Sequence, residues 1–286
     1  MDKNKVSKSK QPLYLMIPLY IACVVLAILS IVPFWVMIVN ATRSTTQIQQ
    51  HAISFIPGSS IAKNFSILNA KKTFNPIIGF TNSAVISVGV TGLAVYFSSL
   101  TAYAITAYDW KLKNAFFSMI MAIMMIPAQV TTIGFYQAVY KVGMTNNRLM
   151  LILPAIASPM MVFFMRQYLQ ASLSMEIVQS GRIDGAGEFR IFNQIVLPIM
   201  KPAIATQAIF TFVSSWNSYF MPLVLLTKSE KYTMPIMVSL LNGDIYKTEF
   251  GCVYLGLTMT VLPLIIVYLF LSKYIVAGVA LGGVKG

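Results

Sequence analysis

Long apolar stretches alternate with short charged segments along this chain of 286 residues. A bilayer core of about 30 Å requires about 20 apolar residues of helix, so a charge-free stretch of that length can hold one transmembrane helix. Each of the stretches below holds one helix, and none comfortably holds two. The pattern therefore predicts an all-α polytopic membrane protein with six transmembrane helices. The stretches without Asp, Glu, Lys or Arg are 11–42, 73–108, 114–140, 149–165, 202–227 and 250–272.

The composition agrees with this prediction and excludes several functions. Apolar residues make up 57% of the chain and charged residues only 10%, whereas about 25% of residues are charged in soluble domains. The longest predicted non-spanning segment, about 40–80, is too short for a self-supporting catalytic domain. No phosphate-binding GxxxxGK[ST] loop is present. We therefore expect no enzyme activity and no cofactor in this chain, and any ATP that drives it, with its Mg²⁺, to be hydrolysed by another chain.

The polar residues indicate neither nucleic acid nor a metal as a partner. The net charge is +13, but the basic residues flank the apolar stretches instead of forming one continuous surface, which is typical of membrane proteins. Cys23 and Cys252 lie in or beside apolar stretches without CxxC spacing, and His51 is the single histidine. We expect no metal site and no disulfide framework.

The charges also predict the orientation in the membrane. Four lysines precede the first apolar stretch, and the positive-inside rule keeps that end in the cytoplasm. The stretch is too long for a secretory signal and lacks a small-residue cleavage site, so we expect it to be retained as a span. The predicted organisation is a cytoplasmic tail (1–12), a transmembrane domain (13–276) with an inner loop (166–201) and two outer loops (40–80 and 226–250), and a second cytoplasmic tail (277–286).

The 166–201 loop is the most polar segment of the predicted inner face. One helical pattern covers about 172–183 and is broken at Gly185. A second helical pattern is amphipathic, and such a helix fits docking on membrane lipid or on a partner protein. Its expected apolar face consists of Phe189, Phe192, Ile195 and Val196, and Pro198 and Pro202 end it.

The spacing of four residues in this loop resembles a known signature. Gly185, Ile195, Leu197 and Pro198 follow the pattern G-x9-I-x-L-P, after RIDGA at 182–186. This resembles the cytoplasmic EAA loop of permease subunits of binding-protein-dependent ABC importers. Within that family the chain is similar to the shorter permease of the maltose-type, carbohydrate-uptake branch. Further segments that resemble the family are 99–110, 125–140, 163–172, 214–226 and 278–286.

The resemblance implies a type I ABC importer permease in a bacterial plasma membrane. It implies a pathway for a sugar or oligosaccharide, formed with a paralogous permease subunit. It also implies two ATPase subunits, and an extracytoplasmic sugar-binding protein toward which the 226–250 loop reaches. The loop residues that it assigns to ATPase coupling are Glu176, Gln179, Ser180, Gly181, Asp184, Gly185, Ala186, Phe189, Phe192, Ile195, Leu197 and Pro198.

The chain departs from the family pattern at the start of the loop. Gln179, Ser180 and Gly181 stand where the family has Glu-Ala-Ala, so small size is kept while the carboxylate is lost. A neutral amide is a weaker hydrogen-bond acceptor than a carboxylate, and Glu176, one turn upstream, is a candidate replacement. Ser174 stands where the family usually has proline.

Polar residues within the predicted spans are candidates for lining a pathway. Asn217 and Tyr219 are the best candidates, with Ser215 beside them and Gln129 and Thr132 in the third stretch. Hydrogen-bonding groups facing lipid would be costly, so we expect some of them to face a cavity. The alternative is that they form hydrogen bonds between helices and only stabilise the bundle.

Three other functions are compatible with six spans. The chain could be a membrane scaffold that tethers a partner through the 166–201 loop, an ABC permease for a cargo other than sugar, or an ion-coupled carrier that works alone. All eight acidic residues lie outside the six stretches, which leaves no evident carboxylate relay for a proton-coupled carrier. A permease subunit of an ATP-driven sugar importer is the leading hypothesis.

Overall fold

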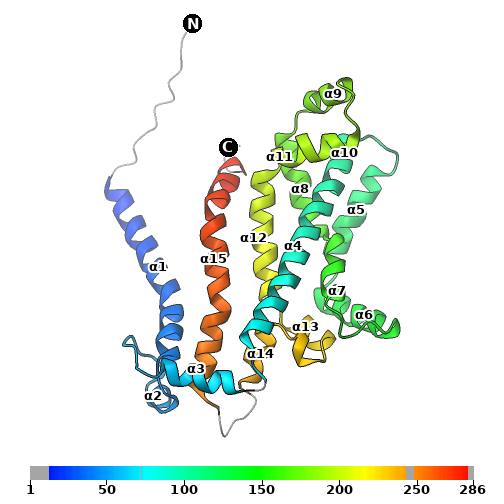
Figure 1. Ribbon diagram of the computed structural model, residues 1–286. Coiled ribbons are helices and arrows are strands. Elements are labelled where there is room, and N and C mark those ends of the chain that lie inside the picture. The colour runs from blue at the N-terminus through cyan, green and yellow to red at the C-terminus, as the bar shows by residue number, and fades with distance from the viewer. Residues whose placement is uncertain (1–12, 72, 243–247, 283–286) are drawn as a thin grey trace. The chain divides into compact units, whose positions relative to one another are not determined.

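The protein is described by a computed structural model that covers residues 13–71, 73–242 and 248–282 (Figure 1). Within these ranges all regular secondary structure is helical. The elements are α1 (Leu13–Ala41), α2 (Thr45–Gln50), α3 (Ile61–Ala70), α4 (Pro76–Ala107), α5 (Lys113–Met124), α6 (Ala128–Lys141), α7 (Leu149–Ile152), η1 (Leu153–Ile156), α8 (Pro159–Ser172), α9 (Met175–Ile183), α10 (Glu188–Ile191), η2 (Phe192–Val196), α11 (Leu197–Ile199), α12 (Lys201–Trp216), α13 (Phe220–Leu225), η3 (Ser229–Lys231), α14 (Met234–Leu240) and α15 (Phe250–Gly282).

The chain divides into two compact units. Of the described residues, the first unit contains 13–70 and 248–258, and the second contains 71, 73–242 and 259–282. Helix α15 contributes residues to both. The candidate site lies in the second unit.

Four helical segments in the described part of the chain are long and apolar enough to cross a membrane. They are Met16–Ala41, Pro76–Ala107, Leu149–Ser172 and Phe250–Phe270. They confirm helical spans in the first, second, fourth and sixth predicted stretches. Within the fourth, the α-helix gives way to a 3₁₀ turn at Leu153–Ile156 that contains Pro154.

The third predicted span is wrong as a single helix. Helix α5 ends at Met124, and α6 begins at Ala128 after Pro127, whose φ of −59° and ψ of 131° lie outside the helical region. A proline has no backbone N–H to donate and disfavours helix in the residue before it, so the helix breaks here. Twelve residues of α5 extend only about 18 Å, short of a bilayer core.

The fifth predicted stretch, 202–227, is not one helix either, because α12 ends at Trp216 and α13 begins at Phe220. Helix α12 has 16 residues, about 24 Å of length, and ends at Trp216. It meets the preceding segment Glu188–Ile199 at an angle of 79°. Neither segment alone is long enough to cross a membrane, but the two together are. The described part of the chain therefore has four spans, or five if this bent pair counts as one span.

Helix α4 is the central element of the second unit. It packs against α8 and α12 along its length and against α14 near its N-terminal end (Figure 1). Small side chains make the close packing possible, because Ser87, Ser98 and Ser99 of α4 are fully buried. Arg166 of α8 is partly buried, and its guanidinium lies 4.0 Å from the centre of the Phe117 ring of α5. The side chain therefore packs on an aromatic neighbour.

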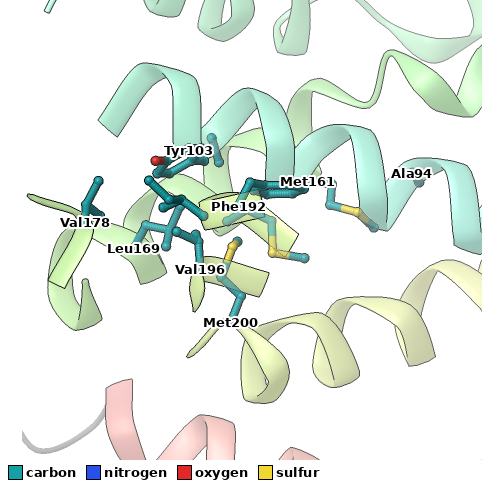
Figure 2. Packing of buried hydrophobic residues seen from close by; sticks show 11 residues of the cluster. Ala94, Tyr103, Met161, Leu169, Val178, Phe192, Val196 and Met200 are labelled. Atoms are coloured by element: carbon teal, nitrogen blue, oxygen red, sulfur yellow. The ribbon is translucent and has the colours of Figure 1, made fainter. Parts of the chain in front are cut away.

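A buried apolar cluster joins the end of α4 to the segment between α8 and α12 (Figure 2). Phe192 is its central side chain, since its ring stacks on Tyr103 at 5.8 Å and meets Tyr96 edge-on at 5.7 Å. Each aromatic pair of this kind contributes about 0.5–1.5 kcal/mol beyond the burial of its area. The buried members of the cluster are Ala94, Ala102, Tyr103, Met161, Met165, Leu169, Val178, Ile191, Phe192, Val196 and Met200.

At the other end of α4, buried polar groups fix the segment that follows α13. The Asn82 amide donates to the carbonyls of Glu230 and Tyr232, both at 2.9 Å, and the hydroxyl of Ser83 accepts from the Met234 amide at 2.9 Å. A Cβ atom at Gly79 would lie 2.6 Å from the sulfur of Met234. The first half of the predicted 226–250 loop is therefore held against α4.

The first unit is organised around a buried arginine. The Arg43 guanidinium donates to Asn40 Oδ1 at 2.9 Å and to the carbonyls of His51 and Gln47, both at 2.8 Å. These acceptors lie in or next to α1 and α2. Nearby, the buried side chain of Asn64 donates to the Arg43 carbonyl at 2.9 Å, and the Cys252 thiol donates to the Asn64 carbonyl at 3.3 Å. Cys252 is thus a packing residue.

Candidate functional site

The first part of the candidate site is the loop between α8 and α12, residues 173–200, called the 173–200 loop below. Helix α9 begins after Ser174, whose hydroxyl accepts from the Glu176 amide at 3.3 Å. Serine is a preferred N-cap residue because it satisfies one of the unpaired amides of the first turn. The serine that replaces the family's proline therefore caps the helix.

Helix α9 ends in a Schellman turn at the glycine that the sequence singled out. Gly185 has a φ of +78°, its amide donates to the Arg182 carbonyl at 3.1 Å, and the Ala186 amide donates to the Gly181 carbonyl at 3.0 Å. This pair of bonds satisfies carbonyls at the end of the helix, and it needs a left-handed residue that only glycine adopts without cost. The predicted helix break at Gly185 is confirmed.

Gly181 is needed for a different reason, namely close packing. A Cβ atom there would lie 3.1 Å from Cδ1 of Ile195 and 3.3 Å from Cγ1 of Ile191. The small residue thus lets α9 approach the helical segment that follows it. Together with buried Val178, it forms the inner face of α9.

The outer face of α9 is exposed. It carries Glu176, Gln179, Ser180 and Asp184, and it also exposes two large apolar side chains, Ile177 and Ile183. Ile183 keeps 85% of its surface. Exposed apolar side chains at the edge of a polar helix are typical of a protein contact.

The expected apolar face of the second helix is partly wrong. Phe192 and Val196 are buried and Ile195 is partly buried, but Phe189 is 69% exposed, and Ile191 is buried in its place. The reason is a π-helical turn over Phe192–Val196, which adds a residue to the turn and shifts the register between α10 and α11. Leu197 packs partly against the buried cluster, and Pro198 lies exposed in α11 just before the bend.

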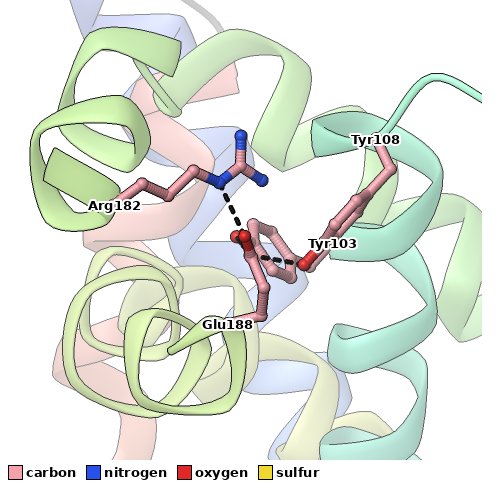
Figure 3. A network of polar contacts seen from close by, with 4 residues as sticks. All are labelled: Tyr103, Tyr108, Arg182 and Glu188. Atoms are coloured by element: carbon pink, nitrogen blue, oxygen red, sulfur yellow. Dashed lines mark hydrogen bonds and ion pairs between the residues drawn. The ribbon is translucent and has the colours of Figure 1, made fainter. Parts of the chain in front are cut away.

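A polar cluster ties both helices of the loop to α4 (Figure 3). The Nε atom of Arg182 lies 2.6 Å from Glu188 Oε1, and the hydroxyl of Tyr103 donates to Glu188 Oε2 at 3.2 Å. The hydroxyl of Tyr108 also donates to Glu188 Oε2, and the Arg182 guanidinium lies over its ring. Glu188 therefore holds α9, α10 and the end of α4 together.

The electrostatics of this cluster follow from its hydrogen bonds. The Arg182 guanidinium, and then the Tyr108 hydroxyl, lower the pKa of the Glu188 carboxyl below its ordinary value of 4.5. Partial burial, and then the hydrogen bond to Glu188, raise the pKa of Tyr108 above 10.0. The carboxylate is thus charged and the phenol neutral over the physiological range.

The second part of the candidate site is a large cavity in the second unit, about 1550 Å³ in volume. Side chains of α4, α6, α8, α12 and the adjoining turns line it. Of the predicted lining residues, Thr132 and Ser215 lie on its wall. Asn217 caps the end of α12 and Tyr219 precedes α13, and neither of them is among the lining residues. The side chain of Gln129 lies outside the described part of the structure.

Other polar residues of the cavity wall lie on α12 or just after it and were not predicted as a set. Gln207, Thr211, Ser214 and Ser218 all line it. Spacings of four and three residues place the first three on one face of α12, and Ser218 lies two residues beyond the end of that helix. This helical spacing could have predicted a polar face on the cavity wall, whereas Asn217 and Tyr219 were chosen only for their residue types.

Comparisons with known proteins agree with this architecture. Residues 99–281 match the family described as "Binding-protein-dependent transport system inner membrane component". The chain is 34% identical to the arabinooligosaccharides transport system permease protein AraQ of Halalkalibacterium halodurans, over 91% of this chain and 93% of that protein. It is 30% identical to the lactose transport system permease protein LacG of Rhizobium radiobacter, over 91% and 92%.

A solved structure shares the fold. It is the crystal structure of a bacterial ABC transporter involved in the import of the acidic polysaccharide alginate, with a TM-score of 0.78 and 21% sequence identity. The match covers 92% of this chain and 96% of that one. The arrangement of helices described above is therefore that of an ABC importer permease.

Proposed function

Because this chain belongs to the family of binding-protein-dependent transport system inner membrane components, we propose that it forms, with a second permease, the pathway through which an ABC importer moves a sugar or oligosaccharide. The single observation that carries the choice of a sugar is the similarity, over nearly the whole length, to permeases named for arabinooligosaccharides and lactose. The cavity, about 1550 Å³ in volume, is large enough to hold a sugar or oligosaccharide.

In this proposal the chain performs no catalysis. Two separate ATPase subunits bind ATP and Mg²⁺, and their movement reaches this chain through the 173–200 loop. The exposed face of α9, with Glu176, Gln179 and Ile177, is the surface offered to an ATPase. Glu176 lies one turn before Gln179 on this exposed helix, so it can supply a carboxylate where the family's glutamate is missing.

The loop is suited to transmit force because it is fixed at several points. Buried side chains of α9, α10 and η2 join one apolar cluster with α4 and α8, and Glu188 adds polar contacts. A rigid segment that continues into α12 through a bend of 79° converts a displacement of α9 into a tilt of that helix. Such tilting opens a pathway alternately to the two sides of the membrane.

The orientation and the remaining partner follow from the same proposal. Both ends of the chain and the 173–200 loop face the cytoplasm, and the 226–250 loop faces outward. An extracytoplasmic sugar-binding protein delivers the cargo there. The contacts from Asn82 to the carbonyls of Glu230 and Tyr232 support a docking role, because they give the start of that loop a defined position.

Purification of the tagged chain from its native membrane, followed by reconstitution, tests the proposal. We expect an ATPase and a second polytopic permease to copurify, and we expect the reconstituted assembly to import a labelled sugar when binding protein and ATP are supplied. A chain that copurifies with a cytoplasmic partner but moves no cargo would instead be a scaffold. ATP-dependent import of a cargo other than a saccharide would identify a permease outside the sugar branch.

A further inference from the structure

The wall of the cavity contributed by α12 and the residues just after it carries a ladder of polar side chains, defined as Gln207, Thr211, Ser214 and Ser218 and called the α12 ladder below. The first three share one face of α12, and Ser218 lies two residues beyond the end of that helix. None is charged. Their amide and hydroxyl groups both donate and accept hydrogen bonds.

Within the described part of the chain, the four side chains of the α12 ladder make no hydrogen bond. Other hydroxyls on the long helices behave differently. Thr206, the neighbour of Gln207, donates to the Pro202 carbonyl at 3.0 Å, and Thr101 of α4 donates to the Phe97 carbonyl at 2.8 Å. The hydroxyls of Thr206 and Thr101 are hydrogen-bonded within their own helices, whereas the side chains of the α12 ladder are not.

An unpartnered polar group at membrane depth is costly unless water, a ligand or another protein satisfies it. For serine and threonine the cost is modest, because a rotation of χ1 can direct the hydroxyl to the carbonyl four residues back. The Gln207 amide has no such option, since its two donors and its acceptor need external partners. Its position on the cavity wall therefore indicates that the cavity holds hydrogen-bonding groups.

The rest of the wall is apolar and aromatic, and its described lining contains no Asp, Glu, Lys, Arg or His. Phe135, Phe164 and Phe210 contribute rings, and Tyr168 adds a ring with a hydroxyl. Apolar and aromatic walls with a few placed polar groups are typical of sites for small molecules. An anionic cargo would lose its hydration here without gaining an opposite charge, which is strongly unfavourable.

We infer that the cavity passes an uncharged saccharide, whose hydroxyl groups exchange hydrogen bonds with the α12 ladder while its C–H faces pass over the aromatic rings. The inference rests on the proposed function and narrows it to neutral cargo. It distinguishes this chain from the transporter that shares its fold, which is described as importing an acidic polysaccharide.

The test uses the complete assembly in proteoliposomes with its binding protein. The variant Gln207→Leu combined with Thr211→Val removes the hydrogen-bonding groups from the middle of the α12 ladder. The matched control is Thr101→Val in α4, whose hydroxyl is already bonded to the Phe97 carbonyl and which is not among the lining residues of the cavity. The probes are labelled arabino-oligosaccharides and lactose as neutral cargo and an alginate oligosaccharide as anionic cargo.

We expect wild-type assembly to import a neutral probe and not the anionic one. The double variant should import the neutral probe about tenfold more slowly, since two neutral hydrogen bonds are lost. Its ATPase activity, stimulated by the loaded binding protein, should stay within about twofold of wild type, and Thr101→Val should import normally. That combination separates a defect in cargo contact from a defect in coupling.

Three results would overturn the inference while leaving the proposed function intact. They are import of the anionic probe by the wild type, wild-type uptake by the double variant, and loss of the second permease from the purified double variant. The last would assign the α12 ladder to a protein interface. Absence of any ATP-dependent saccharide import by the wild type would instead refute the proposed function itself.

Discussion

Arg182 and Glu188 form an ion pair, Nε to Oε1 at 2.6 Å, across the Schellman turn that separates α9 from α10. Glu188 also accepts from Tyr103 and Tyr108 of the α4 end. One carboxylate thus links the exposed helix of the 173–200 loop to the central helix of the second unit. If an ATPase docks on α9, this cluster is a direct polar route by which its movement reaches α4.

Replacing Glu188 by Gln should weaken that route without unfolding the loop, because the apolar cluster around Phe192 remains. The ion pair is partly exposed, so its loss costs little free energy, and we expect uptake to fall only about threefold. ATPase activity should be retained, so that more ATP is hydrolysed for each sugar imported. The ratio of labelled sugar to phosphate released in proteoliposomes measures this effect.

Arg190 provides the matched control for this prediction. It lies on the same short helix as Glu188, and in the described structure its side chain bonds only to Gln194, at 2.9 Å. Arg190→Gln should leave the sugar-to-phosphate ratio unchanged. Equal ratios for Glu188→Gln and the wild type would show that the polar cluster transmits nothing.

The stability of the 173–200 loop should depend on pH through the same carboxylate. The pKa of Glu188 is lowered in the folded protein, so its contribution is present above its ordinary value of 4.5 and is lost as the pH falls through the lower folded value. Thermal unfolding of the detergent-solubilised protein should show a wild-type advantage over Glu188→Gln at neutral pH that shrinks below pH 4.5 and vanishes once the pH is below the lowered pKa of the folded state. A wild-type advantage that persisted undiminished in strongly acidic buffer would contradict this role for the Glu188 carboxylate.

Tyr108 gives the opposite dependence at high pH. Its pKa is raised in the folded protein, so the stability it contributes is present below its ordinary value of 10.0 and is lost as the pH rises through the higher folded value. A Tyr108→Phe variant lacks this contribution. Its unfolding temperature should therefore approach that of the wild type only in strongly alkaline buffer.

The sequence predicted the local features of the 173–200 loop well, because they depend on neighbouring residues. The glycine in RIDGA marks the end of α9, and the hydrogen bonds of the Schellman turn lie within six residues. The exposure of Phe189 was missed because a π-helical turn has no simple sequence signal and changes the helical register by about one residue.

Features that depend on distant contacts were not predictable from one sequence. Glu188 meets Tyr103 and Tyr108 only after the chain folds, and a pair such as Arg182 and Glu188 spans a turn instead of one helical face. The counting of spans failed in the third stretch, where the helix breaks at Pro127, although Pro18 and Pro33 in α1 and Pro263 in α15 leave their helices continuous. Hydropathy measures how apolar a segment is, and it does not register the break at Pro127.

In the first unit, Gly251 should not tolerate even a methyl group. A Cβ atom there would lie 2.6 Å from the Arg43 carbonyl oxygen and 2.7 Å from Oδ1 of Asn64, both in a buried hydrogen-bonded region. Gly251→Ala should lower the free energy of unfolding by about 1–3 kcal/mol through overpacking. Gly92→Ala in α4, where a Cβ meets no atom within 4 Å, should be neutral or slightly stabilising. Thermal unfolding of both purified variants, followed side by side, checks the difference.

Two glycines of the 173–200 loop, two positions apart, offer a sharp test of its turn. Gly185 has a φ of +78°, which valine adopts only at a cost of about 1–2 kcal/mol, whereas Gly187 has a φ of −68° and a ψ of 155°, which valine adopts readily. Neither glycine has an atom within 4 Å of its Cβ position, so the two variants differ in backbone strain and not in steric contact. Gly185→Val should reach the membrane in normal amounts but lose most ATP-dependent uptake, because α9 would no longer end in the orientation that the proposed ATPase contact requires. Gly187→Val should keep most of its uptake. Normal uptake by Gly185→Val, at equal amounts in the membrane, would rule out a rigid coupling loop.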